Sequence, residues 1–235
     1  SLDGENIVVL DSEKEVGRLP LHNLEGIVSF GYRGTSPALM GACADRNISL
    51  CYLTPQGKFL ARVSGKIKGN VILREQQYAS SQSEEKSLEI AKNCIIGKVH
   101  NARWVLERAT RDHSMQIDVE KVKSASDKLR KSLELIKSCQ SKEQLRGFEG
   151  EAASVYFGVL DELILQQKKE FTFQGRNKRP PLDHVNALLS FVYTLLTNTI
   201  TSALETVGLD PCIGYLHTER PGRVSLSLSY RRASC

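Results

Sequence analysis

The sequence predicts an α+β fold, in which a small N-terminal β-sandwich-like domain is followed by an all-α domain. Residues 1–68 hold short apolar runs bounded by turn residues, whereas residues 71–208 hold apolar side chains spaced by three and four. The 235 residues are 40% hydrophobic and 25% charged, with a net charge of +5, which excludes a disordered chain. We expect two domains, residues 1–70 and residues 71–235.

Four strands and one helix are expected in the first domain. Ser36 followed by Pro37 is typical of an N-cap and a first helical position, so a helix begins there. Short runs separated by turns are typical of a small sandwich or barrel, here a scaffold or dimerisation surface. The expected strands cover residues 7–10, 24–30, 48–53 and 59–63.

Four helices are expected in the second domain. Ser141 begins a capping-box pattern, and Asp183 is placed to cap the last helix, which ends before Gly208. The expected helices cover residues 84–110, a segment around 129–136, and residues 141–163 and 184–207.

The chain shows no secretory signal and no membrane span. The longest apolar-leaning stretch, residues 185–196, is interrupted by four polar residues and is too short to cross a bilayer. Six scattered cysteines form no CxxC pair, and several occupy apolar positions, which indicates free thiols in a reducing compartment. We expect a cytoplasmic protein with no membrane partner.

Glu149 is the first candidate functional residue. Two glycines flank it in Arg146-Gly-Phe-Glu-Gly-Glu-Ala-Ala153, and each costs about 1 kcal/mol in a helix interior. Close approach of a backbone or a ligand would account for that cost. Glu149 shares a helix side with Leu145 and Ala152, and a carboxylate facing a core must be paired, protonated or bound to a metal. From this segment alone, a buried salt bridge is favoured over a metal site.

Two further segments carry basic or titratable groups. Residues 166–181 hold five Lys/Arg against one Glu, with two phenylalanines interleaved; this suits phosphate and base contacts, or a solvated loop with its rings in the core. His217 lies in the glycine- and proline-rich residues 208–225, beside Arg220 and Arg223. A loop histidine is a candidate ligand or general base, but more often a structural group. A carboxylate, an imidazole and arginines together suit a divalent cation acting on a phosphodiester.

The same residues resemble the CRISPR-associated endonuclease/integrase family, the universal spacer-acquisition nuclease. The match spans nearly the whole chain and looks closest to the subset that accompanies type I-C systems. The N-terminal half contributes Leu2-Asp-Gly, Pro20-Leu-His-Asn-Leu-Glu-Gly and Gly69-Asn-Val. The C-terminal half contributes Arg-Gly-Phe-Glu149-Gly, Asp183-x-Val-Asn186, Gly-Tyr-Leu-His217 and Arg220-Pro-Gly-Arg223.

The resemblance implies an activity and a set of partners. Family members have an N-terminal β domain and a C-terminal helical catalytic and DNA-binding domain, and they form homodimers. Two dimers clamp a small ferredoxin-like second spacer-acquisition protein, and the complex joins the 3′ ends of captured DNA to the repeat by metal-dependent transesterification. The expected substrates are double-stranded and branched DNA, and the expected cofactor is Mg²⁺ or Mn²⁺.

The resemblance also assigns metal ligands, with one departure. The family's catalytic glutamate falls on Glu149 and its histidine on His217, whereas the position of its aspartate is occupied by Ser229. The family's helical tail does not follow and its short first strand does not precede, so we expect a chain truncated at both ends. Losing one carboxylate weakens a site for a hard cation, so nuclease and integrase activity is expected to be impaired.

Other roles follow from the resemblance or stay open. The resemblance implies that Asn186 and Tyr193 either support the site or face DNA. From the helical periodicity alone, they could equally be buried helix residues. The alternatives are a non-catalytic DNA-binding or assembly protein (a truncated remnant), or a helical RNA-binding protein with a β dimerisation domain. The expected phosphate contacts are Arg176, Lys178, Arg179, Arg220 and Arg223.

Overall fold

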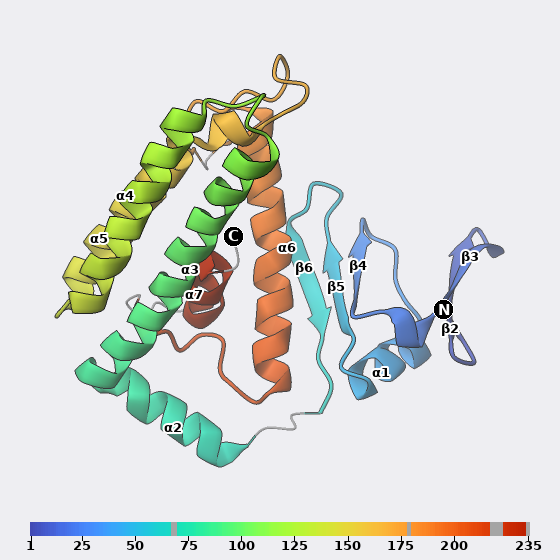
Figure 1. Cartoon of the computed structure of the whole chain (residues 1–235). Helices are drawn as coiled ribbons and strands as arrows, with labels where there is room; N and C mark the ends of the chain where they lie inside the picture. Colours follow the sequence, from blue (N-terminus) through green and yellow to red (C-terminus); the bar gives the residue numbers. More distant parts are fainter. Residues whose placement is uncertain (67–69, 178–179, 217–222, 234–235) are drawn as a thin grey trace. The chain divides into compact units, whose positions relative to one another are not determined.

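The computed structural model has a mixed α+β fold, with small sheets first and helices after them (Figure 1). Two compact units make up the chain. The first combines Ser1–Asn70 with Thr194–Leu209, and the second combines Val71–Tyr193 with Asp210–Cys235. The structure describes residues 1–66, 70–177, 180–216 and 223–233.

The predicted division of the chain differs from the observed units in one segment. The prediction places residues 194–209 in the helical domain, whereas the structure joins them to the first unit. An ion pair contributes to this association, because Arg62 Nη2 lies 2.6 Å from Glu205 Oε1. Such a contact across the sequence cannot be read from local composition.

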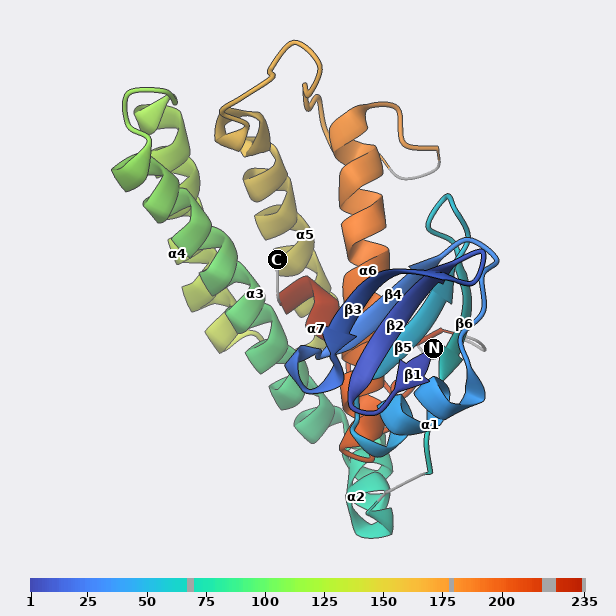
Figure 2. The ribbon, with the colours of Figure 1, turned by 90° about the vertical axis from the view of Figure 1, so that its right-hand side faces the viewer.

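Two three-stranded sheets, the helix α1 and the second part of α6 (His184–Thr206) belong to the first unit. Its elements are β1 (Leu2–Asp3), β2 (Asn6–Asp11), β3 (Lys14–Pro20), β4 (Gly26–Phe30), α1 (Pro37–Asp45), β5 (Ser49–Leu53) and β6 (Phe59–Val63). The sheet β1-β2-β3 is antiparallel, and the sheet β4-β5-β6 contains a parallel pair, β4 and β5, connected by α1 (Figure 2). Parallel strands need a crossover of this kind.

The first unit contains the four predicted strands and more. β2, β4, β5 and β6 lie where strands were expected, and Ser36 caps α1 by accepting a hydrogen bond from Leu39 N at 3.3 Å. β3 was not predicted, because none of its residues is buried and its sequence lacks an apolar alternation. The helix between β4 and β5 was predicted, but the parallel pairing of these two strands was not. The core includes Leu21 and Leu50, both fully buried.

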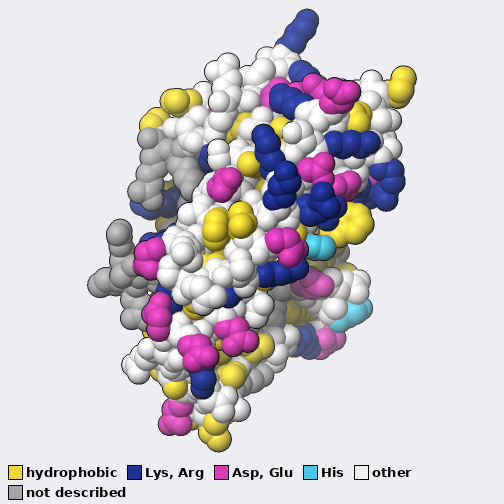
Figure 3. Space-filling view, turned by 60° about the vertical axis from the view of Figure 1, so that its left-hand side comes forward, with side chains coloured by type: hydrophobic (Ala, Val, Ile, Leu, Met, Phe, Trp, Pro, Cys, Tyr) yellow, Lys and Arg dark blue, Asp and Glu magenta, His cyan; other side chains and the backbone are white. Residues whose placement is uncertain are grey.

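Helices build the second unit. They are α2 (Val71–Gln82), α3 (Glu84–Asp112), α4 (Val119–Ser138), α5 (Lys142–Phe157), the first part of α6 (His184–Thr206) and α7 (Ser225–Ala233). α3, α4 and α5 pack against one another, and α7 packs against α3 (Figure 1). Leu106, Leu129 and Leu145 are nearly inaccessible in the shared core. Charged side chains of both signs are scattered among other atoms on the face of the molecule drawn in Figure 3.

The predicted helix starts at Ser141 and Asp183 are confirmed, because each depends on a cap formed within three residues. Ser141 Oγ accepts a hydrogen bond from Gln144 N at 3.2 Å, and Asp183 Oδ1 accepts one from Asn186 N at 2.7 Å. The third predicted helix is too long, because α5 ends at Phe157 and a short 3₁₀ helix, Leu160–Leu163, follows. The intervening Gly158 is a poor helix former. α2 and α7 were not predicted as separate helices.

α6 is longer than the apolar stretch that the sequence predicts. It is continuous over 23 residues, and an 18-residue window has a mean hydropathy of 1.4 with 11% of its residues buried. By length and composition it could cross a bilayer, so the predicted limit at residues 185–196 was too narrow. One such helix is weak evidence for a membrane, and Asn186 and Ser190 on it accept hydrogen bonds from Arg176.

The segment before α7 runs very close to that helix. Leu226 N donates a hydrogen bond to the carbonyl of Pro211 at 3.0 Å. A Cβ atom on Gly214 would lie 2.7 Å from the Ser225 Cβ atom and 3.2 Å from its backbone carbon. Glycine is therefore needed at position 214 because no side chain fits between the two segments.

The substitution Gly214→Ala is expected to reduce the free energy of unfolding by about 1–3 kcal/mol, because a backbone must shift to admit the methyl group. Urea denaturation measures the change. Gly97→Ala on α3 is the matched control, since no described atom outside the neighbouring backbone of α3 would contact its new Cβ. We expect that control to stabilise the chain by about 1 kcal/mol. Equal effects of the two substitutions would contradict the steric argument.

Candidate functional site

The candidate site is a cavity of about 250 Å³ within the helical unit. Residues of α3, α4, α5, α6 and the segment 166–181 line it. Among the described lining residues, three are basic, one is acidic and three are aromatic, a composition that suits an anionic ligand with planar groups. The lining includes Lys98, Arg146, Glu149, Tyr156, Arg176 and Tyr193.

Glu149 is the carboxylate of this cavity, and it carries a salt bridge. The residue is 6% exposed, and its Oε1 lies 3.0 Å from Lys98 Nζ on α3. The buried pair that the sequence favoured for this segment is therefore present. Lys98 was not predicted as a site residue, although its place on α3 close to Ile95 in the apolar stripe of that helix is a usable signal.

Arg146 holds the segment that leads to the predicted histidine ligand. Its Nη2 and Nε atoms donate hydrogen bonds to the carbonyl oxygen of Leu216 at 2.7 and 3.2 Å. Arg146 precedes Glu149 by three residues on α5. The residue before His217, Leu216, is therefore held to α5 close in sequence to Glu149. His217 and Arg220 themselves lie outside the described residues.

Asn186 is fully buried and uses its whole hydrogen-bonding capacity. Its Oδ1 accepts from Arg176 Nη1 at 2.6 Å and from Asn177 N at 3.1 Å. Its Nδ2 donates to the carbonyl of Gly175 at 2.8 Å and to Asp183 Oδ2 at 2.7 Å. An amide side chain offers two donors and one carbonyl oxygen, and all are engaged here. Asn186 therefore fixes the backbone of this loop and the direction of Arg176.

Arg176 turns inward rather than into solvent. Its guanidinium carbon lies 5.6 Å from the centre of the Tyr193 ring, a cation–π contact, and its buried Nε has no hydrogen-bond partner among the described residues. Phe173 of the same loop is buried, with its ring centre 6.0 Å from that of Phe157. For Phe173 the core alternative, not base stacking, describes the observed position.

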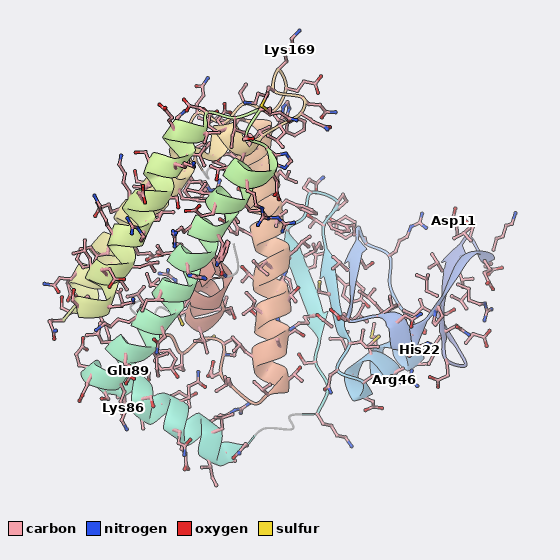
Figure 4. The ribbon with its side chains drawn as sticks, in the orientation of Figure 1. Asp11, His22, Arg46, Lys86, Glu89 and Lys169 are labelled. Carbon is pink, nitrogen blue, oxygen red and sulfur yellow. The ribbon has the colours of Figure 1, made fainter. Side chains whose placement is uncertain are left out.

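The other predicted site residues that the structure describes, Ser229 and Arg223, are not among the residues that line the cavity. Ser229 on α7 is 6% exposed, and its Oγ donates a hydrogen bond to the Ser225 carbonyl at 3.0 Å. Arg223 is half-buried just before α7. Lys178 and Arg179 lie outside the described residues, while other parts of the same loop are well exposed, such as Lys169, which points away from the helices (Figure 4).

Glu149 is the one carboxylate among the described residues that line the cavity, and it could contribute one ligand to a divalent cation. Within the described ranges, no three His, Cys, Asp or Glu side chains gather closely enough to hold a metal ion. Mg²⁺, however, retains several waters and commonly binds through one or two carboxylates. Glu149 supplies one such carboxylate at the wall of a cavity, and it already accepts a cation, the Lys98 ammonium.

Comparison with known proteins gives consistent matches. The family model described as CRISPR associated protein Cas1 matches residues 1–229. The chain is 46% identical over 228 residues to CRISPR-associated endonuclease Cas1 1 of Chlorobaculum tepidum, and 47% identical over 230 residues to CRISPR-associated endonuclease Cas1 2 of Rhodospirillum rubrum. These alignments cover 97% and 96% of this chain, which spans 66% of the length of each relative.

Solved structures share the fold at low sequence identity. A CAS1 protein from Thermotoga maritima matches the whole of this chain with a TM-score of 0.77 and 22% identity, and the match covers 71% of that protein's chain. A casposase bound to an integration product gives a TM-score of 0.76 at 22% identity over 66% of that chain. A Cas6-RT-Cas1–Cas2 complex gives 0.72 at 21% identity over 25% of that chain. All three cover the whole of this chain.

Replacing Asn186 by aspartate is expected to destabilise the helical unit. Asn186→Asp removes the Nδ2 donors and sets a second carboxylate beside Asp183, so we expect a loss of about 3 kcal/mol at pH 8, measured by urea unfolding. Asn93→Asp, at an exposed site on α3, is the control and should change stability by less than about 0.5 kcal/mol. A comparable loss in both variants would refute the hydrogen-bond argument.

The contact between Asp183 and Asn186 makes the stability of the helical unit depend on pH. Burial raises the pKa of Asp183, but hydrogen bonds from Asn186 and Asn177 outweigh it and hold that pKa below its ordinary value. The stability contributed by Asp183 is therefore present above about pH 4 and is lost as the pH falls through the folded-state pKa. In Asn186→Asp the two carboxylates repel, so its deficit should narrow below about pH 5. A deficit that is constant with pH would contradict this expectation.

Proposed function

The chain belongs to the Cas1 family of CRISPR-associated proteins, and from this membership we propose that it is a metal-dependent DNA endonuclease/integrase of spacer acquisition. The cavity around Glu149 is its proposed active site. One observation carries this assignment: a buried carboxylate shares a cavity with three basic side chains and aromatic rings. That combination can bind a cation and a phosphodiester side by side.

Each residue has a proposed role in this site. Glu149 and His217 hold Mg²⁺ or Mn²⁺, which when bound polarises the phosphodiester and activates a water. Arg176 contacts DNA phosphate, and its contacts with Asn186 and Tyr193 keep its guanidinium at the cavity. Arg146 keeps the segment before His217 attached to α5.

The proposed substrates are double-stranded and branched DNA, and the proposed partners are a second copy of the chain and a small second spacer-acquisition protein. The likeness to a casposase bound to an integration product supports DNA as the substrate. The likeness to a Cas6-RT-Cas1–Cas2 complex supports the small second protein as a partner. We place this activity in the cytoplasm and, more narrowly, in type I-C systems. Further proposed phosphate contacts are Lys178, Arg179, Arg220 and Arg223.

Catalysis is proposed to be impaired in this chain. The resemblance places Ser229 at the family's aspartate position, and its hydroxyl donates a hydrogen bond to the Ser225 carbonyl of its own helix. A hydroxyl so engaged is a poor replacement for a carboxylate ligand of a hard cation. The same observation favours the second candidate function, a non-catalytic DNA-binding or assembly protein.

Ser229→Asp tests the impairment. We expect cleavage of branched DNA in Mn²⁺ to rise at least about tenfold over the unsubstituted chain, because the resemblance assigns a carboxylate ligand of the metal to position 229. Glu149→Gln should abolish cleavage in both backgrounds. Ser227→Asp is the matched control, since Ser227 is buried on the same helix and should give no gain. Robust cleavage by the unsubstituted chain that Glu149→Gln removes would show that Ser229 does not impair it.

Arg176→Ala tests the phosphate contact. Binding to double-stranded DNA should weaken to a similar extent for different sequences, and the slope of log K against log salt should fall by about one. Fluorescence anisotropy over a salt series measures both. Arg130→Ala, at an exposed site on α4, serves as the control for lost charge. A change in sequence preference instead would exclude a simple phosphate role.

A further inference from the structure

We propose that Lys98 is an internal competitor for the metal site: its ammonium and a divalent cation alternate at the Glu149 carboxylate. The inference rests on the proposed function, in which Glu149 is a metal ligand. It adds a residue of α3 to the site and a way in which the fold itself sets the affinity for metal.

The geometry of the pair motivates the proposal. Lys98 Nζ lies 3.0 Å from Glu149 Oε1, where a hydrogen-bonded cation neutralises the carboxylate. The two side chains are 19% and 8% exposed, and both line the same cavity. In such a weakly solvated place an ammonium and a divalent cation repel each other strongly at one carboxylate. Metal binding therefore has to displace the ammonium.

The cavity offers space for the Lys98 ammonium once a metal ion displaces it from Glu149. Its charge sits at the end of a flexible four-carbon chain, and the cavity extends from Glu149 to Arg146 and Arg176. A released ammonium would face the volume in which a DNA phosphate is proposed to bind, and a lysine is a good point-charge ligand for phosphate. Metal binding and phosphate binding would then favour each other through a single side chain.

Direct Mn²⁺ binding to the full chain, without DNA, tests the competition. Electron paramagnetic resonance of free Mn²⁺ gives the dissociation constant. Lys98→Met is expected to bind Mn²⁺ about tenfold more tightly than the unsubstituted chain. Lys98→Arg is expected to bind several-fold more weakly, because a guanidinium holds a carboxylate with two parallel hydrogen bonds. Lys131→Met, at an exposed site on α4, removes the same charge elsewhere and should leave the affinity unchanged.

Unchanged or weaker binding by Lys98→Met would overturn the proposal. If that variant does not fold, Lys98→Arg decides alone, because an affinity equal to that of the unsubstituted chain would also overturn it. Glu149→Gln separates this inference from the proposed function. If Glu149→Gln loses Mn²⁺ binding while both Lys98 variants bind normally, only the competition is wrong. If Glu149→Gln binds Mn²⁺ normally, the metal site and the competition both fail.

Discussion

A buried carboxylate must have a cation beside it, and the helical unit is organised around this requirement at Glu149. An unpaired charge in a weakly solvated interior costs several kcal/mol. The helices α3 and α5 therefore have to pack so that Lys98 and Glu149 lie side by side. An apolar pair of the same volume would stabilise the interface as well and would close it. The ion pair instead holds the two helices together while leaving a polar wall on the cavity.

The irregular segment before α7 depends on the same helices. Backbone groups outside regular structure must be satisfied by other partners when they are buried. Gln77 on α2 donates to the Asp210 carbonyl at 2.8 Å, Ser87 on α3 donates to the Tyr215 carbonyl at 2.9 Å, and Arg146 on α5 donates to the next carbonyl. Three helices therefore fix the path of this segment as far as the residue before His217.

Sequence reasoning succeeded where the signal is local. The periodicity of α3 and the caps of α1 and α5 depend on residues within a few positions of each other, so they could be predicted. The pairing of β4 with β5 and the existence of β3 depend on tertiary contacts, and they could not. At the site, helical spacing predicted that Glu149 faces the core. Its partner Lys98 is 51 residues away, and only the packing of two helices brings it there. The hydrogen bonds of Asn186 depend on a loop conformation that composition does not specify.

The two glycines beside Glu149 have a consequence for engineering. Apart from the neighbouring backbone of α5, no described atom lies within 4 Å of the place where a Cβ would stand on Gly147 or Gly150, so packing among the described residues does not require glycine there. Alanine would make α5 more stable by about 1 kcal/mol at each position. Gly150, however, lines the cavity. A thermostabilised version of the protein would find its easiest gains on either side of the candidate carboxylate, and there a gain in stability would be set against access for the substrate.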